Sequence, residues 1–409
     1  MKIIHTSDWH LGRTIYGRGC HNEFQAFLQW LIIEIEQQKA DCLLIAGDIF
    51  DNTTPSNTTQ SNYYSFLHEI SATCCRHIVI IGGNHDSPSL LNAPRELLKH
   101  LNINVIGSIT DRPEDEIIVL CAPDGSEELM VCAVPYLRDR DIRKAEAGET
   151  VEDKAGKLIT GIAKHYQLVI DAALRKRKEC GWDIPIVAMG HLFTSGGKIL
   201  DNNEVRELYV GSLAHLHASH FPKEIDYLAL GHLHIAQCVN DNERIRYCGS
   251  PLQFSFGKNN RDKSITAVNI TETISIETIP VPPFLRLQTI SGNRQEIMKA
   301  LEDTKKSLQN VLVEIVFTGQ NIASLKDSLG VILDGSNIEL IRVVHRRLLE
   351  QAQEQKVSLE TLKNLTEFDV FRRCLDINSI SEPTRQELEY CFADILKSIA
   401  EEDSEKEKE

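Results

Sequence analysis

The chain has 409 residues, of which 42% are apolar and 25% are charged, and its formal net charge is −15 at pH 7. This is the composition of a soluble globular protein, and the length predicts a large catalytic domain with smaller attached parts. No apolar stretch approaches the roughly 20 residues that a membrane-spanning helix needs, so we expect no such helix. The acidic charge neither selects nor excludes a nucleic acid substrate, because net charge governs solubility and non-specific attraction.

The N-terminus does not have the pattern of a signal peptide. The first four residues lead directly into His5 and Asp8, and cleavage would remove the first candidate ligand motif. We therefore expect a cytoplasmic protein. The eleven cysteines are odd in number and lack the spacing of a disulfide framework, and several lie in apolar strand-like runs: Cys42, Cys121, Cys132 and Cys248. Reduced, buried thiols are the better interpretation.

Strand-like and helical patterns alternate from residue 1 to about 280. Short, mostly unalternating apolar runs, typical of buried strands, occur at residues 3–4, 43–45, 78–81, 186–188 and 227–230. Two helical stripes lie between them, one formed by Phe24, Phe27, Leu28, Leu31 and Ile35, the other by Leu158, Ile159, Ile162, Tyr166 and Ile170. Further strands are expected at 116–121, 129–134, 208–210 and 245–248. The pattern predicts an α/β domain in which a two-sheet sandwich is flanked by helices.

The rest of the chain predicts three further parts. Val281, Pro282 and Pro283 interrupt regular structure, and a strand, helix, strand, helix, strand pattern begins at Leu285, with strands at 285–290, 311–317 and 338–344. Two helical stretches follow at about 348–365 and 383–400. We expect domains at 1–280, 284–346 and 347–400, and a disordered tail at 401–409, where six acids and two lysines stand without an apolar residue.

Five of the predicted strands are followed by residues that can bind a metal ion. The motifs are Asp8-x-His10, Gly47-Asp48, Gly83-Asn84-His85-Asp86, Gly190-His191 and Gly231-His232-Leu233-His234. In open α/β sheets, ligands collect at the carboxyl ends of strands, so we expect these side chains to meet in one site. The glycines suit a tight departure of the backbone from each strand, where a Cβ would crowd the site.

The donor types indicate the kind of metal. Carboxylate, imidazole and amide donors without thiolate favour Mn²⁺, with Mg²⁺, Fe²⁺ or Zn²⁺ as alternatives. Seven ligands are too many for one ion: Asp8, His10, Asp48, Asn84, His191, His232 and His234. If one carboxylate bridges, two ions could lie roughly 3.5 to 4 Å apart, as in two-metal hydrolases. Such a pair suits phosphodiester hydrolysis, because it activates water and stabilises the charge of the transition state.

His85 and Asp86 are the candidate catalytic residues. A histidine that is not a ligand can donate a proton to the leaving oxygen, and Asp86 could fix its orientation and raise its basicity. A single Gly-His or Asp-x-His motif is usually an ordinary turn or a core histidine, but five together at strand ends favour a metal site. Five other histidines lack that support and are expected outside the metal site: His5, His77, His215, His217 and His220.

These motifs resemble the calcineurin-like metallophosphoesterase superfamily, whose motif order is D-x-H, GD, GNH[DE], GH and GHxH. Five segments, at 6–12, 46–51, 83–87, 135–138 and 247–251, resemble more closely the SbcD family of nuclease subunits. The resemblance covers about residues 1 to 345. It implies one ion held by Asp8, His10, Asp48 and His234, and another held by Asp48, Asn84, His191 and His232. It also implies that Asp48 bridges the ions and that His85 lies near the scissile phosphate.

The same resemblance implies an activity and a partner. It implies an ATP-dependent 3′-to-5′ exonuclease on double-stranded DNA ends and an endonuclease on single strands and hairpins, acting in DNA repair, recombination and replication. It further implies an SbcC-type coiled-coil ATPase partner, since this chain lacks a G-x-x-x-x-G-K-[ST] phosphate loop. Residues 284–346 would be a capping domain that helps to place DNA, and residues 347–400 would dock on the ATPase. The protein would associate with the nucleoid when bound to DNA.

The resemblance also implies a homodimer through helices near the N-terminus, for which 23–38 and 60–72 are candidates. Trp30, Ile33, Tyr63 and Tyr64 lie partly outside the main stripes there, which suits an interface or a thick core equally. Six basic residues near the motif loops could contact DNA phosphates or be ordinary solvated charges: Arg13, Arg18, Arg138, Arg140, Lys198 and Arg206. The basic run at 175–178 is more simply explained by the end of a predicted helix, where positive charges interact favourably with the helix dipole.

Two other functions stay open at this point. The first is a two-metal phosphoesterase acting on phosphoprotein or on small phosphodiesters, against which the expected cap and helical tail argue. The second is a non-catalytic scaffold of the same fold, which would be expected to have lost ligands, whereas this chain retains all seven.

Overall fold

The computed structural model describes residues 1–143, 150–195, 216–256, 262–306, 310–319 and 322–345, with a few residues between 371 and 392. The chain forms two compact units, Met1–Ile315 with Ala323–Val343 and Val316–Ile322 with Val344–Glu409, and the following description concerns the first unless stated. Several expectations lie outside the described residues: the strand at 208–210, Lys198, Arg206, His215, most of the helical region and the acidic tail.

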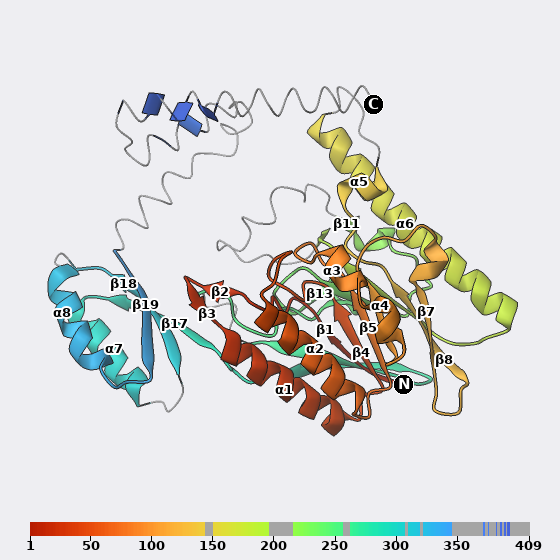
Figure 1. Cartoon of the computed structure of the whole chain (residues 1–409), viewed down its shortest axis with the longest axis horizontal. Coiled ribbons are helices and arrows are strands. Elements are labelled where there is room, and N and C mark those ends of the chain that lie inside the picture. The colour runs from red at the N-terminus through yellow and green to blue at the C-terminus, as the bar shows by residue number, and fades with distance from the viewer. Residues whose placement is uncertain are drawn as a thin grey trace. The chain divides into compact units, whose positions relative to one another are not determined.

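Two six-stranded sheets form the large domain (Figure 1). The first has the order β16-β15-β1-β4-β5-β6, in which β1 (Lys2–Thr6), β4 (Cys42–Ala46), β5 (His77–Ile81) and β6 (Ile103–Ile106) are parallel. The strands β15 (Ser264–Ile270) and β16 (Ile274–Pro280) extend it in antiparallel pairing. The four parallel strands are nearly continuously buried, which explains their unalternating sequences.

The second sheet has the order β13-β14-β12-β9-β8-β7. Its parallel strands are β8 (Glu127–Ala133), β9 (Ile186–His191), β12 (Tyr227–Gly231) and β14 (Asn242–Tyr247). The edge strands β7 (Ile117–Cys121) and β13 (Gln237–Val239) are antiparallel to their neighbours. The strand predicted from Glu116 begins one residue later, because Glu116 ends the 3₁₀ turn η1 (Pro113–Glu116) and its buried carboxylate accepts from Thr110 N and faces His165 Nε2 at 2.8 Å.

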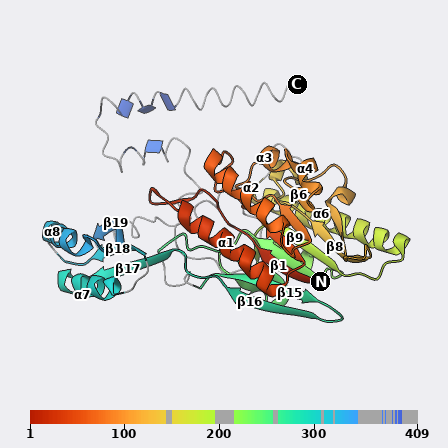
Figure 2. The ribbon, with the colours of Figure 1, turned by 60° about the horizontal axis from the view of Figure 1, so that its bottom comes forward.

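Helices cover the outer faces of both sheets. The helices α1 (His21–Gln38) and α2 (Asn57–Ser71) lie side by side and pack on the first sheet, whereas α6 (Val151–Cys180) packs on the second (Figures 1 and 2). The buried residues of α1 are the five of its predicted stripe. A separate apolar layer, including Ile3, Leu44, Val131 and Val187, fills the space between the sheets. The predicted two-sheet sandwich flanked by helices is confirmed.

Short elements complete this domain. They are β2 (Thr14–Ile15), β3 (Arg18–Gly19), α3 (Pro88–Asn92), α4 (Arg95–Lys99), α5 (Asp139–Ile142), β10 (Thr194–Ser195), β11 (Leu216–His217) and the 3₁₀ turn η3 (Ala218–His220). The part that follows contains β17 (Arg286–Gly292), α7 (Arg294–Lys305), β18 (Val311–Phe317), α8 (Ile322–Leu333) and β19 (Ile338–His345), with sheet order β17-β18-β19. This is the expected alternation of strands and helices, and its role as a cap stays a prediction.

Candidate metal centre

The seven predicted ligands all lie at the carboxyl ends of parallel strands. Asp8 and His10 follow β1, Asp48 follows β4 and Asn84 follows β5, all in the first sheet. His191 is the last residue of β9, and His232 and His234 follow β12, both in the second sheet. The two sheets therefore contribute donors to one place between their strand ends, as expected for ligands of an α/β fold.

The backbone at these strand ends is bent into an unusual conformation. Four of the ligands have positive φ angles, 52° at Asp8, 49° at His10, 51° at Asp48 and 100° at His232. Residues with a Cβ rarely adopt this region, and it is found where function over-determines the backbone. The motif glycines are needed for close approach, since a Cβ at Gly83 would overlap the Asp48 carboxylate. The sharp turns bring donors together at a cost in backbone strain.

One group of donors consists of Asp8, His10 and His234, whose ligand atoms lie within 4.8 Å of one another. The Nε2 atoms of His10 and His234 face each other at 3.0 Å. His10 Nδ1 lies 3.3 Å from Asp51 Oδ1, so a proton on Nδ1 leaves Nε2 as the metal-binding nitrogen. Burial lowers the pKa of His10, which keeps a lone pair available there.

A second group consists of Asp48, Asn84, His191 and His232. Asn84 Oδ1 lies 3.0 Å from His191 Nε2 and 3.0 Å from His232 Nδ1. Asp48 Oδ2 lies 3.3 Å from His191 Nε2 and 3.6 Å from His10 Nε2, so this carboxylate stands between the two groups. Asp8 links them as well, because its carboxylate accepts from the backbone N–H of His232 at 2.9 Å.

The electrostatics of the second group call for a cation. His191 Nδ1 lies 2.9 Å from the carbonyl oxygen of Ala46 and donates to it, so a neutral ring points the Nε2 lone pair at the oxygens of Asn84 and Asp48. Burial opposes a charge on His191, yet the Asp48 carboxylate outweighs it and raises the pKa of His191 to about 9. Burial and the neighbouring His191 lower the pKa of His232 to about 3. Donors that repel one another unless a positive charge lies between them fit a divalent metal ion.

His85 lies beside both groups. Its ring stands at 4.8 Å from that of His10, edge to face, and its backbone N–H donates to Asp48 Oδ1 at 2.9 Å. Its Nδ1 lies 2.8 Å from the carbonyl oxygen of Asp51. The contacts with Asp48 and with the Asp51 carbonyl oxygen thus fix the position of this histidine.

Asp86 has a different environment from the one expected. Its carboxylate is buried and accepts backbone N–H groups of Ile49, Phe50 and Gly83 at 3.2, 2.9 and 2.8 Å. Burial and the nearby Asp48 raise the pKa of Asp86 to about 6. The carboxylate joins the loops that follow β4 and β5, and the expected effect of Asp86 on the orientation of the His85 ring stays a prediction.

Asp51 lies in this site, although the sequence analysis did not single it out as a candidate. Its carboxylate contacts His10 Nδ1 and, at 3.4 Å, Arg13 Nη1, while its carbonyl oxygen contacts His85. The signal was its place three residues after Asp48 in a segment already singled out. The role could not be read from spacing, because it depends on β1 and β4 lying side by side.

The other candidates from the sequence have varied surroundings. Arg13 stacks over the Phe254 ring at 4.8 Å and lies near the metal ligands. Arg18 pairs with Glu23 and Glu339, and Arg140 is largely exposed beside Asp141. Exposed His217 and His220 contact each other at the end of β11. His5 is buried against Tyr227 and His77 faces the carbonyl oxygen of Cys121, so both are structural, as expected.

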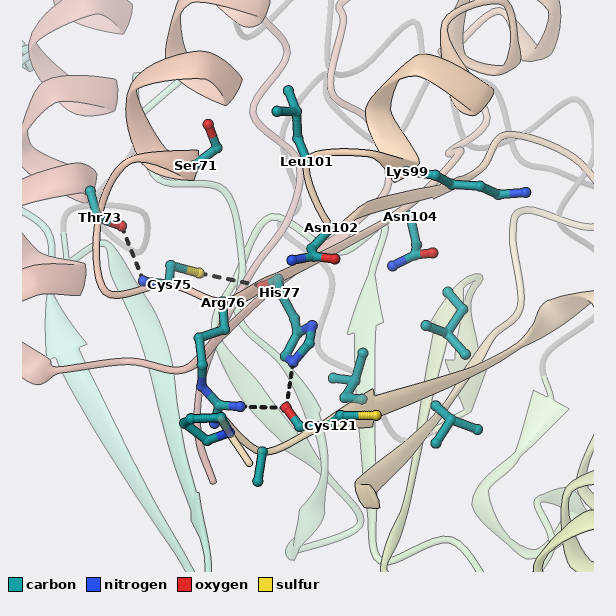
Figure 3. Close-up of a pocket in the computed structure, with 15 residues that line it drawn as sticks. Ser71, Thr73, Cys75, Arg76, His77, Lys99, Leu101, Asn102, Asn104 and Cys121 are labelled. Atoms are coloured by element: carbon teal, nitrogen blue, oxygen red, sulfur yellow. Dashed lines mark hydrogen bonds between the residues drawn. The ribbon is translucent and has the colours of Figure 1, made fainter. Parts of the chain in front are cut away.

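A hollow of about 570 Å³ lies at the opposite ends of the strands (Figure 3). His77, the first residue of β5, lines it together with Asn102, Asn104 and Cys121. Arg76 and His77 both contact the Cys121 carbonyl oxygen, and Arg76 also pairs with Asp41 and Glu128. These polar groups are satisfied by one another, so this hollow lacks the unbalanced donors of the metal centre.

Comparisons with known proteins agree with this geometry. Residues 1–236 match the family model described as calcineurin-like phosphoesterase, and residues 283–378 match that of the type 5 capsule protein repressor C-terminal domain. The chain is 33% identical to the SbcD component of the SbcCD nuclease of Escherichia coli strain K12, over 98% of this chain and 99% of the relative. The SbcD components from Rhodobacter capsulatus and Bacillus subtilis are each 32% identical, over 74% and 66% of this chain and 75% and 66% of the relative.

Across the described helices, none is long and apolar enough to cross a membrane. The match to the phosphoesterase model covers more than half of the chain, and the Escherichia coli relative aligns along nearly all of it. This chain belongs to the calcineurin-like phosphoesterase family and, within that family, to the SbcD nuclease subunits.

Proposed function

We propose that this chain is the Mn²⁺-dependent nuclease subunit of an SbcCD-type complex that hydrolyses phosphodiester bonds in DNA. It acts as a 3′-to-5′ exonuclease on double-stranded ends and as an endonuclease on single strands and hairpins. The observation that carries the proposal is the convergence of seven donors from five strand ends around a place that calls for positive charge. Membership of the SbcD family supports DNA as the substrate.

In this proposal Asp8, His10 and His234 hold one ion, and Asn84, His191 and His232 hold the other. Asp48 bridges them, since its Oδ2 lies within 3.6 Å of nitrogens from both groups. Two bound divalent ions would supply a hydroxide near neutral pH and neutralise the phosphate oxygens. The absence of a thiolate among the donors favours Mn²⁺ over a structural zinc.

The protein orients these donors before any substrate arrives. Asp51 Oδ1 lies 3.3 Å from Nδ1 of His10 and favours a proton there, and the Ala46 carbonyl oxygen is bonded to Nδ1 of His191, so each ring would use Nε2 as a ligand. Such partners fix the ring and the position of its proton, and their loss typically costs about 10- to 100-fold in metal affinity or activity.

His85 is the proposed proton donor. With Nδ1–H donating to the Asp51 carbonyl oxygen and the backbone N–H to Asp48, the doubly protonated ring would give its Nε2 proton to the leaving oxygen and keep the proton on Nδ1. Asp86 acts indirectly, because its carboxylate binds backbone N–H groups next to Asp48 and close to His85. We assign it a positioning role.

The partners follow from family membership together with the domain organisation. Residues 284–346 cap the centre and help to place DNA, residues 347–400 dock on an SbcC-type ATPase, and the protein acts in the cytoplasm, on the nucleoid when DNA is bound. The proposed homodimer uses the outer faces of α1 and α2. Ile33 is 52% exposed and suits that interface, whereas Tyr63 is buried against Phe50 and belongs to the core.

The test is cleavage of end-labelled DNA, with Mn²⁺ or Mg²⁺ and with or without the ATPase and ATP. Linear duplexes labelled at one 3′ or one 5′ end report polarity, a hairpin reports endonuclease action, and a p-nitrophenyl phosphodiester stands for the alternative substrate class. We expect DNA cleavage with Mn²⁺, and duplex degradation that requires the partner. Hydrolysis of the small ester with no cleavage of any DNA in the complete complex would overturn the proposal.

A further inference from the structure

Lys263 is a buried cation beside the metal centre that the proposed mechanism does not use. It stands immediately before β15, and its side chain is only 8% exposed. Its Nζ donates to the carbonyl oxygen of His234 at 3.0 Å and lies 2.8 Å from Ser250 Oγ. Burying an ammonium group is costly unless its hydrogen bonds are satisfied, so a lysine at this place needs a reason.

Three segments of the chain come together at the His234 carbonyl oxygen. It also accepts the backbone N–H of Ser250 at 3.3 Å, and Gly249 lies so close that a Cβ there would be 3.0 Å from it. The loops that follow the neighbouring strands β12 and β14, and the residue that precedes β15, are thus joined at one atom of a proposed metal ligand.

The bond from Lys263 crosses from one sheet to the other. Lys263 leads into β15, which pairs with β1, and β1 ends in the segment that carries Asp8 and His10. The Lys263 carbonyl oxygen accepts from Val281 N at 2.8 Å, which anchors its own backbone in the first sheet. His234 belongs to the second sheet, so the lysine fixes a donor of one sheet against the donors of the other.

We propose that Lys263 is a positioning residue that clamps the His234 carbonyl and so sets the His234 ring opposite His10 in the group that binds the first ion. The inference rests on the proposed function, because it concerns the same pair of ions. With the carbonyl held, the ring is confined between His10, whose Nε2 is 3.0 Å away, and Phe254, whose ring centre is 5.7 Å away. Without the clamp, the loop after β12 loses this tie to the first sheet.

The experiment is a Mn²⁺ titration of Lys263→Met in the full-length protein, followed by electron paramagnetic resonance and by the Mn²⁺ dependence of DNA cleavage. Methionine keeps the apolar length of the side chain and removes its donors. Lys263→Arg restores donors, and Lys263→Gln offers a second, shorter replacement should the methionine variant not be recovered. Lys305→Met is the matched control, because Lys305 Nζ also donates to a carbonyl oxygen, that of Ile332, but in the helical part of the small domain.

We expect one of the two Mn²⁺ affinities, that of the site with His10 and His234, to fall about tenfold or more in Lys263→Met and in Lys263→Gln, as is typical when the partner of a ligand is lost. Saturating Mn²⁺ should restore most of kcat, Lys263→Arg should lie near the wild type, and Lys305→Met should not differ from it. Both Mn²⁺ affinities within twofold of the wild type in Lys263→Met would overturn the inference, as would equal losses in the arginine and methionine variants. A wild-type protein that binds no pair of ions would instead refute the proposed function.

Discussion

The amino and carboxyl ends of the strands in the two-sheet sandwich both carry buried or partly buried charged residues, but these charges are balanced in different ways. At the amino ends, Arg76 and His77 meet acceptors that balance them, among them Asp41, Glu128 and the Cys121 carbonyl oxygen (Figure 3). At the carboxyl ends, Nε2 of His191 lies 3.0 to 3.3 Å from the oxygens of Asn84 and Asp48, and the Asp48 carboxylate favours a positive charge on the His191 ring. One end is balanced by the protein's own ion pairs, whereas the other favours a positive charge among its donors, either a proton on His191 or a metal ion in its place. Stability and catalysis are thereby assigned to different ends of the same strands.

Removal of the bridging carboxylate should give the largest effect. Asp48→Ala takes away a carboxylate that stands near nitrogens of both proposed ion sites, so we expect lower occupancy of both ions and DNA cleavage reduced by roughly a thousandfold or more. Metal analysis of the purified variant checks this. One fully occupied site would contradict the bridge.

The contrast between the ends is sharpest along β5. His85→Ala should retain metal and fold but slow cleavage by roughly 10²- to 10⁴-fold, because a positioned proton donor is lost. His77→Ala, at the other end of the same strand, is the control: it removes a contact to Cys121 and should leave kcat near the wild type. The measurement is the rate of DNA cleavage by both variants at saturating Mn²⁺. Full activity in His85→Ala would refute the role of His85 as proton donor.

Asp51→Ala should have an intermediate effect. Without the carboxylate, the proton of the His10 ring is no longer favoured on Nδ1 and can move to Nε2, the metal-binding nitrogen. We therefore expect Mn²⁺ affinity or activity to fall by about 10- to 100-fold. Asp41→Ala removes a carboxylate at the amino ends that also pairs with an arginine, and it should not alter the metal titration. An equal loss in both variants would mean that Asp51 acts through stability alone.

Proton release should accompany metal binding. The pKa of His191 is raised to about 9 in the metal-free protein, so this group adds stability that is present below pH 6.5 and is lost as the pH rises through 9. A metal ion at Nε2 displaces that proton, so Mn²⁺ affinity should increase between pH 7 and 9. Calorimetry in buffers of different ionisation enthalpy measures the protons released. Release of none near pH 7.5 would show that His191 is already neutral.

The smallest effect on activity is expected at the balanced end. Arg76→Met should lower the free energy of unfolding by about 1 to 2 kcal/mol, since this partly exposed arginine bonds two carboxylates and a carbonyl oxygen. Cleavage should be unchanged within about twofold. Urea unfolding monitored by circular dichroism gives the stability, and a large loss of cleavage at equal folding would end the division between the two ends.

The sequence was sufficient for features that depend on local pattern. Unalternating apolar runs followed by a polar donor, with a glycine before the donor in all but the first, located β1, β4, β5, β9 and β12, because parallel strands are buried on both faces. It was insufficient where a contact depends on which strands are neighbours. The contacts of Asp51 and Lys263 depend on β1 pairing with β4 and with β15, and Asp86 accepts backbone N–H groups from two loops. Tyr63 looked available for an interface because helical spacing does not reveal how thick the core is.

Anomalous diffraction from crystals grown with Mn²⁺ tests the central claim most directly. We predict two strong manganese peaks between the sheets' carboxyl ends. One should be bound by Asp8, His10 and His234, the other by Asn84, His191 and His232, with Asp48 contacting both. A single manganese peak would contradict this claim. So would a structure without manganese at this place, in which these side chains point away from one another.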